Sequence, residues 1–192
     1  MKTLAAMSAL ALLIAACATG PDNGKASATA NPDSFLAAPT NVRAQAAIND
    51  AKGAAIGLAS FAEDRVGVRV DVRVRGLTPG LHGIHVHAVG KCDGPAFTTA
   101  GAHFNPNQKQ HGGLNPAGPH AGDLGNIEVK ADGTGALNFV TPLLSLAPGA
   151  SQSVLSGGGL AVVIHAQPDD DKTDPSGNSG DRIACGVIKA LG

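Results

Sequence analysis

RVGVRVDVRVR, residues 65–75, is the clearest indication of the fold class of this chain. Valines occupy every second position from 66 to 74, while Arg69, Asp71 and Arg73 alternate with them. A period of two over this length predicts a β-strand with one buried face and one face in water. All five valines of the run are therefore expected on the buried face.

Seven more short runs continue this rhythm on either side. They are expected to form strands at 43–49, 54–61, 83–88, 125–130, 134–141, 160–165 and 184–189. Turn-forming sequences such as LTPG (77–80) and ADG (131–133) separate several of them, and the chain has 26 glycines and 12 prolines. The expected fold is all-β, an eight-stranded antiparallel Greek-key sandwich or flattened barrel of immunoglobulin-like type.

Two long segments break the strand rhythm, at 89–124 and 167–181. Irregular loops of this length are uncommon in a compact domain unless they are functional. Both are therefore expected to carry function, whereas 143–159 is expected to be a plain connection.

Histidines mark the first long segment and the strand before it. His85 and His87 lie two positions apart, so a strand turns both to one face, roughly 6.5–7 Å apart, where they can share a metal ion. His165 ends the run 160–165 and is the natural third ligand. His82 lies three residues before His85 and is expected on the opposite face, in a structural, hydrogen-bonded role rather than as a ligand.

A second set of ligand-type side chains follows in the loop. His103, His111 and His120 are followed closely by Asp123. Three imidazole nitrogens with one carboxylate oxygen suit a tetrahedral zinc ion. The loop is therefore expected to hold zinc.

The N-terminus, MKTLAAMSALALLIAACATG, has one lysine, a short apolar run and small residues before Cys17, as in a secretory signal. Ile14, Ala15 and Ala16 before Cys17 resemble a bacterial lipobox; the alternative is an ordinary signal cut after Ala16 or nearby. We expect a signal peptide at 1–16, a lipidated N-terminus and flexible tether at 17–40, and one folded domain at 41–192. The expected location is the periplasm or cell envelope, with the protein anchored to a membrane through lipid on Cys17.

Two cysteines, Cys92 and Cys185, remain after Cys17. In an oxidising compartment such a pair is expected to form a disulfide; two free buried thiols are the alternative. The net charge of −1 and an aromatic content of 3%, without Trp or Tyr, exclude nucleic acid as a partner.

The motifs GIHVHAVG, GAHFNP, HGG, PHAGDLGNI, VVIHAQPDD and GDRIACGVI resemble, in order and nearly in spacing, segments that define the copper/zinc superoxide dismutases. The resemblance runs from about Val42 to the end. It implies dismutation of superoxide to dioxygen and hydrogen peroxide by alternate reduction and reoxidation of a histidine-bound copper beside a structural zinc. One copper and one zinc per chain are expected, and a homodimer is among the expected assemblies.

The resemblance also assigns roles to single residues. The implied copper ligands are His85, His87, His103 and His165. The implied zinc ligands are His103, His111, His120 and Asp123, so that a deprotonated His103 bridges the two metals.

Further residues of the implied site lie near the C-terminus. Asp169 is similar to an aspartate that links a copper ligand to a zinc ligand, here His85 and His111, while Asp170 and Asp171 are expected to be solvated. Arg182 resembles the arginine that docks the anion. Asp181 departs from the family's usual small neutral residue, and its negative charge is expected to weaken superoxide capture.

Three alternatives compete with an enzyme. A copper/zinc carrier would need neither Arg182 nor a bridging histidine. A blue-copper electron carrier would need a thiolate and usually a methionine, and both methionines, Met1 and Met7, lie in the signal. A metal-free structural sandwich would have no need for seven ligand-type side chains in this pattern.

Overall fold

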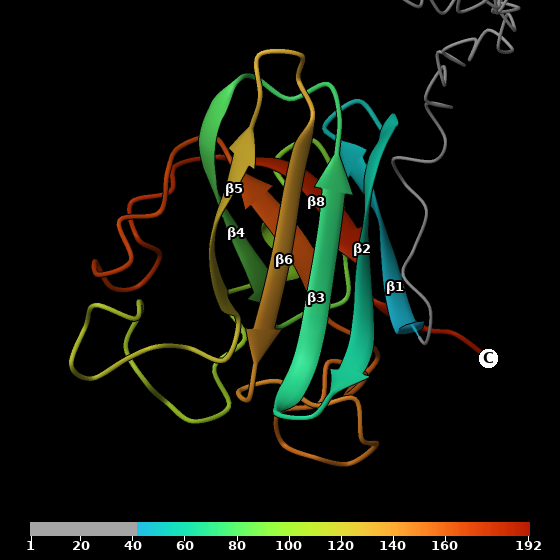
Figure 1. The fold of residues 1–192 in the computed structure, drawn as a ribbon, viewed down its shortest axis with the longest axis vertical. Helices are drawn as coiled ribbons and strands as arrows, with labels where there is room; N and C mark the ends of the chain where they lie inside the picture. Colours follow the sequence, from blue (N-terminus) through green and yellow to red (C-terminus); the bar gives the residue numbers. More distant parts are fainter. Residues whose placement is uncertain (1–41) are drawn as a thin grey trace, which may run out of the picture. The chain divides into compact units, whose positions relative to one another are not determined.

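The computed structural model describes residues 42–192 and shows a sheet of antiparallel strands that closes into a barrel (Figure 1). The strands are β1 Val42–Asp50, β2 Ala55–Asp64, β3 Gly67–Val74, β4 Gly80–His87, β5 Asp123–Val129, β6 Gly135–Thr141, β7 Ala161–His165, β8 Arg182–Val187 and β9 Lys189–Ala190. Their order is β2-β3-β6-β5-β4-β7-β8-β1-β9, and pairing of β1 with β2 closes the sheet. The predicted all-β class and its eight main strands are confirmed; the two-residue β9 is an addition.

Strand β3 shows why the alternating valines predict this fold. Val68, Val70, Val72 and Val74 are all completely buried, while the residues between them are partly exposed. Burial of apolar side chains on one face of each strand supplies the main driving force for closing the barrel.

The prediction for Val66 was wrong. This side chain is 64% exposed, because Arg65 and Val66 form the turn between the paired residues Asp64 and Gly67. A tight hairpin connection ends the alternation, so the first valine of the run lies outside the strand.

Strands β5 and β8 each begin two residues earlier than predicted, and both of these extensions pair with a histidine on a neighbouring strand. Strand β5 begins at Asp123, which pairs with His85, and β8 begins at Arg182, which pairs with His165. Strand β4 lies between β5 and β7. Residues far apart in the chain are thereby brought to one end of neighbouring strands.

The two long loops project from the same side of the barrel (Figure 1). The first contains only a short 3₁₀ helix, η2 Thr98–Ala100, within residues 88–122. The expected disulfide is present: Cys92 joins this loop to Cys185 on β8, with a Cα–Cα distance of 5.7 Å. In the described part of the chain, no helix is long and apolar enough to cross a membrane.

Candidate metal centre

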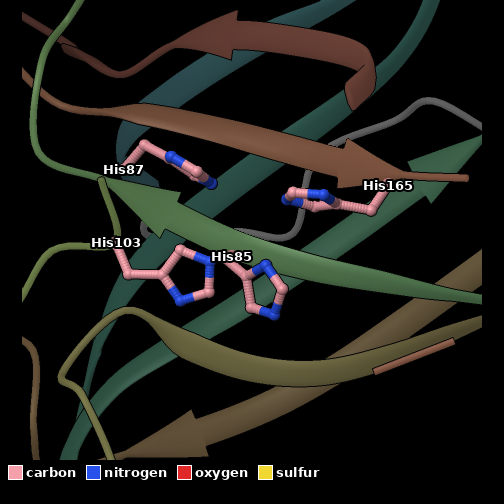
Figure 2. Close-up of side chains that lie close together, drawn as sticks. All are labelled: His85, His87, His103 and His165. Carbon is pink, nitrogen blue, oxygen red and sulfur yellow. The ribbon is translucent and has the colours of Figure 1, made fainter. Parts of the chain in front are cut away.

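Four histidines converge at the end of β4 (Figure 2). His85 and His87 lie on β4 with ring centroids 6.2 Å apart, close to the separation expected from the strand pleat. His165 is the last residue of β7, and His103 pairs with His87 through an isolated β-bridge. All four side chains are buried, and one nitrogen from each lies within 4.8 Å of the others.

Each of these four rings has one nitrogen held by an acceptor outside the cluster of four. Nε2 of His85 is 2.7 Å from Asp169 Oδ2, and Nδ1 of His103 is 3.0 Å from Asp123 Oδ1. The Nδ1 atoms of His87 and His165 donate to the carbonyl oxygens of Gly101 and Gly180, at 2.9 and 3.1 Å.

The remaining nitrogens of the four rings are buried and have no hydrogen-bond partner. They are Nδ1 of His85 and Nε2 of His87, His103 and His165. Buried polar atoms are normally paired, so unpartnered nitrogens in one cluster require an explanation. A metal ion that favours imidazole, such as copper, satisfies all of them together.

A second group of ligand atoms surrounds Oδ1 of Asp123. The Nδ1 atoms of His103, His111 and His120 lie 3.0, 3.1 and 3.3 Å from this oxygen, and those of His103 and His120 are 3.5 Å apart. Tetrahedral zinc with bonds of about 2.0–2.1 Å separates its ligand atoms by about 3.3 Å. The observed distances therefore fit the edges of a zinc tetrahedron.

Backbone contacts orient the Asp123 carboxylate within this group. Its other oxygen, Oδ2, accepts hydrogen bonds from the backbone N–H groups of Gly112 and His120, both at 2.9 Å. Oδ1 is thereby left facing the three histidines. His85 also lies within 4.8 Å of His103, His111 and Asp123, since the two groups adjoin through His103.

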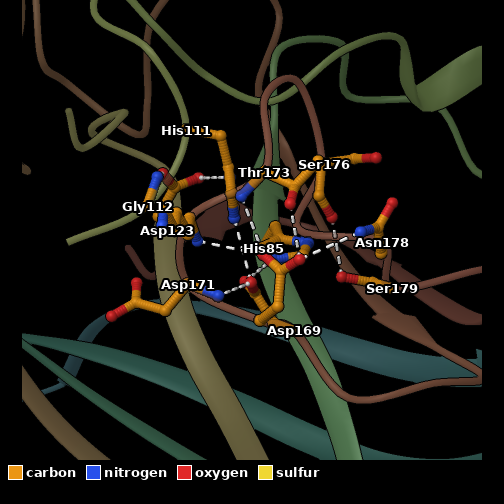
Figure 3. A network of polar contacts seen from close by, with 12 residues as sticks. His85, His111, Gly112, Asp123, Asp169, Asp171, Thr173, Ser176, Asn178 and Ser179 are labelled. Carbon is orange, nitrogen blue, oxygen red and sulfur yellow. Dashed lines mark hydrogen bonds and ion pairs between the residues drawn. The ribbon is translucent and has the colours of Figure 1, made fainter. Parts of the chain in front are cut away.

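Asp169 connects the two groups (Figure 3). Its Oδ2 is 2.7 Å from His85 Nε2, and its Oδ1 is 3.0 Å from His111 Nε2. Sequence analysis did not identify the residue that holds Asp169: the amide of Asn126 donates to the Asp169 carbonyl at 2.9 Å and accepts from the Asp169 N–H at 2.7 Å. Nothing local to Asn126 signals this contact, because it crosses 43 positions of sequence.

Burial keeps the histidines of the first group neutral. Desolvation lowers the pKa of His85 to about 3, of His87 to about 2 and of His165 to about 4, and it also lowers the pKa of His103. A neutral imidazole has the free lone pair that a metal requires. The first group is therefore in its ligand form at neutral pH.

In the second group, by contrast, two carboxylates favour the protonated form of His111, so zinc binding there would release a proton. Burial alone would lower the pKa of His111, but its contacts with the carboxylates of Asp123 and Asp169 outweigh burial and raise the pKa to about 10. Burial would raise the pKa values of Asp123 and Asp169, but hydrogen bonds from the histidines hold both well below the usual range. Two ionised carboxylates at this position favour a cation.

Arg182 and His87 are joined through one carbonyl oxygen. Nη2 of Arg182 donates to Gly101 O at 2.7 Å, and the same oxygen accepts from His87. Nη1 donates to Phe97 O at 2.8 Å, so the guanidinium is held beside the first group. Burial lowers the pKa of Arg182, but a guanidinium stays charged at neutral pH.

A hollow of about 580 Å³ opens in front of Arg182. It is lined by Ala51, Pro95, Ala96, Thr98, Gly180, Asp181, Arg182 and Ile183. Asp181, which directly precedes Arg182 in the chain, therefore lines the same hollow as Arg182.

His82 lies outside both groups. Its Nδ1 is 2.8 Å from the His165 carbonyl oxygen, and its Nε2 is 2.9 Å from that of Thr78. The buried His82 ring thus contacts the backbone of His165 through Nδ1, and its Nε2 also lies 3.4 Å from the Thr78 hydroxyl.

Asp170 and Asp171 both reach solvent, but Asp171 is partly buried and also contacts the other long loop. Its Oδ1 accepts a hydrogen bond of 2.7 Å from Gly113 N in the first long loop, because the two loops pack against each other. Asp170 is exposed, and within residues 42–192 its carboxylate accepts hydrogen bonds from its own loop alone.

Comparison with known proteins identifies one family. The sequence model described as copper/zinc superoxide dismutase matches residues 55–188. Superoxide dismutase (Cu-Zn) 1 of Aquifex aeolicus is 44% identical over 149 residues, which cover 77% of this chain and 88% of that protein. The Cu-Zn superoxide dismutase of Caulobacter vibrioides is 41% identical over 148 residues, which cover 76% and 85%.

A solved structure agrees with these sequences. The crystal structure of a SOD-like protein from Bacillus subtilis superposes with a TM-score of 0.72 at 41% identity, covering 74% of this chain and 96% of that one. The likeness therefore extends over almost the whole of the compared protein.

Proposed function

The chain belongs to the copper/zinc superoxide dismutase family, and we propose that its two ligand groups are a copper site and a zinc site that share His103. It is an oxidoreductase that uses copper and zinc to convert two superoxide anions and two protons into dioxygen and hydrogen peroxide. The observation that carries the site assignment is the set of four buried, unpartnered histidine nitrogens.

The copper site comprises His85, His87, His103 and His165. The outward nitrogens of His85, His87 and His165 are hydrogen-bonded to Asp169 and two backbone carbonyls, which fixes the tautomer and orientation of these three rings. The zinc site comprises His103, His111, His120 and Asp123, whose spacing fits a tetrahedron.

His103 belongs to both sites because its nitrogens face different groups. Nδ1 is 3.0 Å from Asp123 Oδ1, whereas Nε2 is buried without a partner among the other copper ligands. A ring that uses both nitrogens as ligands carries no N–H proton. His103 Nε2 is accordingly the ring atom placed to hold a proton for the reaction.

Bound copper supplies a one-electron redox couple, and bound zinc holds His103. Side chains of the protein bind the substrate and hold the ligands in position. Arg182 binds the superoxide anion by charge and hydrogen bonding, and its bonds to Phe97 and Gly101 keep it oriented beside His87. Asp169 holds His85 and His111 in place from the side opposite their ligand nitrogens.

The test is to measure metal content and superoxide turnover on the same sample of the mature chain, reconstituted with copper and zinc. One copper and one zinc per chain with fast turnover is the expected result. Full metal content with negligible turnover would contradict the enzyme and favour a metal carrier.

Asp181→Asn is expected to increase kcat/KM about twofold at low ionic strength, because it removes a negative charge beside Arg182 in the hollow. The gain should disappear at high salt, where the charge is screened. Stopped-flow measurement across a salt series tests this. Glu63→Gln is the matched control, since Glu63 is an exposed carboxylate near the end of β2, away from the hollow. An equal gain in both variants would show that only net charge matters.

We also propose that the chain is exported and held at a membrane by lipid on Cys17, in the periplasm or cell envelope. The motif before Cys17 supports this, although residues 1–41 lie outside the described structure. The Cys92–Cys185 disulfide also supports it, because disulfides persist in oxidising compartments. A homodimer remains a prediction that sedimentation of the mature chain tests.

Cys17→Ser is expected to abolish lipid attachment and to move the protein from the membrane fraction to a soluble or unprocessed form. Membrane fractionation and the mass of the mature N-terminus measure this. Normal processing with unchanged membrane association in the variant would contradict the lipid anchor.

A further inference from the structure

One more carboxylate, that of Asp174, faces the outward nitrogen of a ligand histidine. Outward nitrogens of His85, His87, His111 and His165 are hydrogen-bonded to Asp169 or to backbone carbonyls. His120 is the exception: its Nε2 lies 3.7 Å from Asp174 Oδ1, an ion-pair contact rather than a hydrogen bond. Asp174 is thus the acceptor that faces the remaining ring.

The same oxygen touches a second zinc ligand through the backbone. Asp174 Oδ1 accepts a hydrogen bond of 2.7 Å from the N–H of His111. One carboxylate oxygen therefore contacts the main chain of His111 and faces the ring of His120. Both contacts join loop 166–181 to the loop that carries the zinc ligands.

We propose that Asp174 is a positioning residue for the zinc site, an inference that rests on the proposed zinc ligands. Its hydrogen bond fixes the backbone at His111, and its charge stabilises the outward N–H of His120, which becomes more acidic when Nδ1 binds a metal. Asp174 thereby orients two zinc ligands from the outer edge of the zinc site, as Asp169 orients His85 and His111 between the two sites.

The size of the effect follows from the geometry. Loss of a partner behind a ligand typically weakens metal binding roughly 10–100-fold. The Asp174 side chain is 46% exposed and its contact with His120 is longer than a hydrogen bond, so water screens part of the interaction. We therefore expect the lower end, about tenfold.

Asp170 provides a matched control in the same loop. Its carboxylate accepts from Lys172 N, Thr173 N, Thr173 Oγ1 and Asn178 Nδ2, all within that loop. Asp170→Ala removes the same charge and loosens the same loop, but it removes no contact with a zinc ligand.

The experiment compares wild type, Asp174→Ala, Asp174→Asn and Asp170→Ala as full mature chains. Zinc affinity is measured by competition with a chromogenic chelator, and ligand geometry by the visible spectrum of Co²⁺ at the zinc site. Asp174→Ala should bind zinc about tenfold more weakly with a shifted Co²⁺ spectrum. Asp174→Asn should lose less, because its amide oxygen can still accept from His111 N–H. Asp170→Ala should match wild type.

Three outcomes would overturn the proposal. The first is that Asp174→Ala binds zinc as tightly as wild type. The second is that Asp170→Ala loses as much zinc affinity as Asp174→Ala, which would indicate that loosening of the loop, and not the Asp174 contacts, weakens binding. Equal losses in Asp174→Ala and Asp174→Asn would show that charge alone acts, without positioning. Failure of wild type to bind zinc would instead overturn the zinc site itself, so the two failures are distinguishable.

Discussion

His165→Ala is expected to remove copper, keep zinc and lower kcat/KM by more than the roughly 10–100-fold that loss of an outer partner costs. His165 supplies one of the four unpartnered nitrogens of the copper group. It is not one of the three histidines whose nitrogens surround Asp123 Oδ1 in the zinc group. Copper and zinc are counted in the same sample in which turnover is measured, with both metals offered in equal amounts.

His120→Ala is the reciprocal control. Its Nδ1 lies 3.3 Å from Asp123 Oδ1, and it is absent from the four-histidine group. This variant should lose zinc and keep copper. Loss of both metals in either variant would contradict two separable sites, and full activity in His165→Ala would contradict the copper assignment.

The metal-free protein is expected to lose several kcal/mol of unfolding free energy as the pH falls from about 6.5 to about 4. In the folded state burial lowers the pKa values of His85, His87 and His165 to about 3, 2 and 4, whereas an unfolded histidine titrates near 6.5. Below pH 6.5 these histidines are protonated in the unfolded chain but remain neutral in the folded chain. As long as such a histidine stays neutral in the folded protein, it lowers the free energy of unfolding by about 1.4 kcal/mol for each unit that the pH falls.

The other shifted groups do not offset this loss in the same window. The raised pKa of His111, about 10, contributes stability that is already fully present below pH 6.5. The depressed pKa values of Asp123 and Asp169 contribute stability present above about pH 4, and it is lost only as the pH falls further.

Urea unfolding at several pH values, with and without metals, measures the effect. Bound metals should move the acid transition to lower pH, because the ligand nitrogens are then occupied. His87→Leu should reduce the slope of the metal-free protein, since it removes one of the buried histidines whose pKa is lowered, while His85, His103 and His165 remain. Metal-free stability that does not change between pH 6.5 and 4 would contradict the burial of neutral histidines.

Local sequence patterns were sufficient for the fold class. A strand turns alternate side chains to opposite faces whatever its neighbours are, so the valines of β3 and the pair His85 and His87 could be placed from spacing alone. The ligand types and the motifs of the family resemblance likewise lie in the sequence. Val66 was misplaced because a turn, not a strand, occupies that position.

The tertiary structure alone decided which nitrogen of each ring is free. That choice depends on acceptors brought from distant loops, such as Asp169 behind His85, 84 positions away, and Gly101, whose carbonyl serves both His87 and Arg182. The roles of Asn126 and Asp174 were hidden for the same reason. Side-chain alternation is set by the local pleat, but contacts across long loops depend on strand register and loop path, which only the folded chain defines.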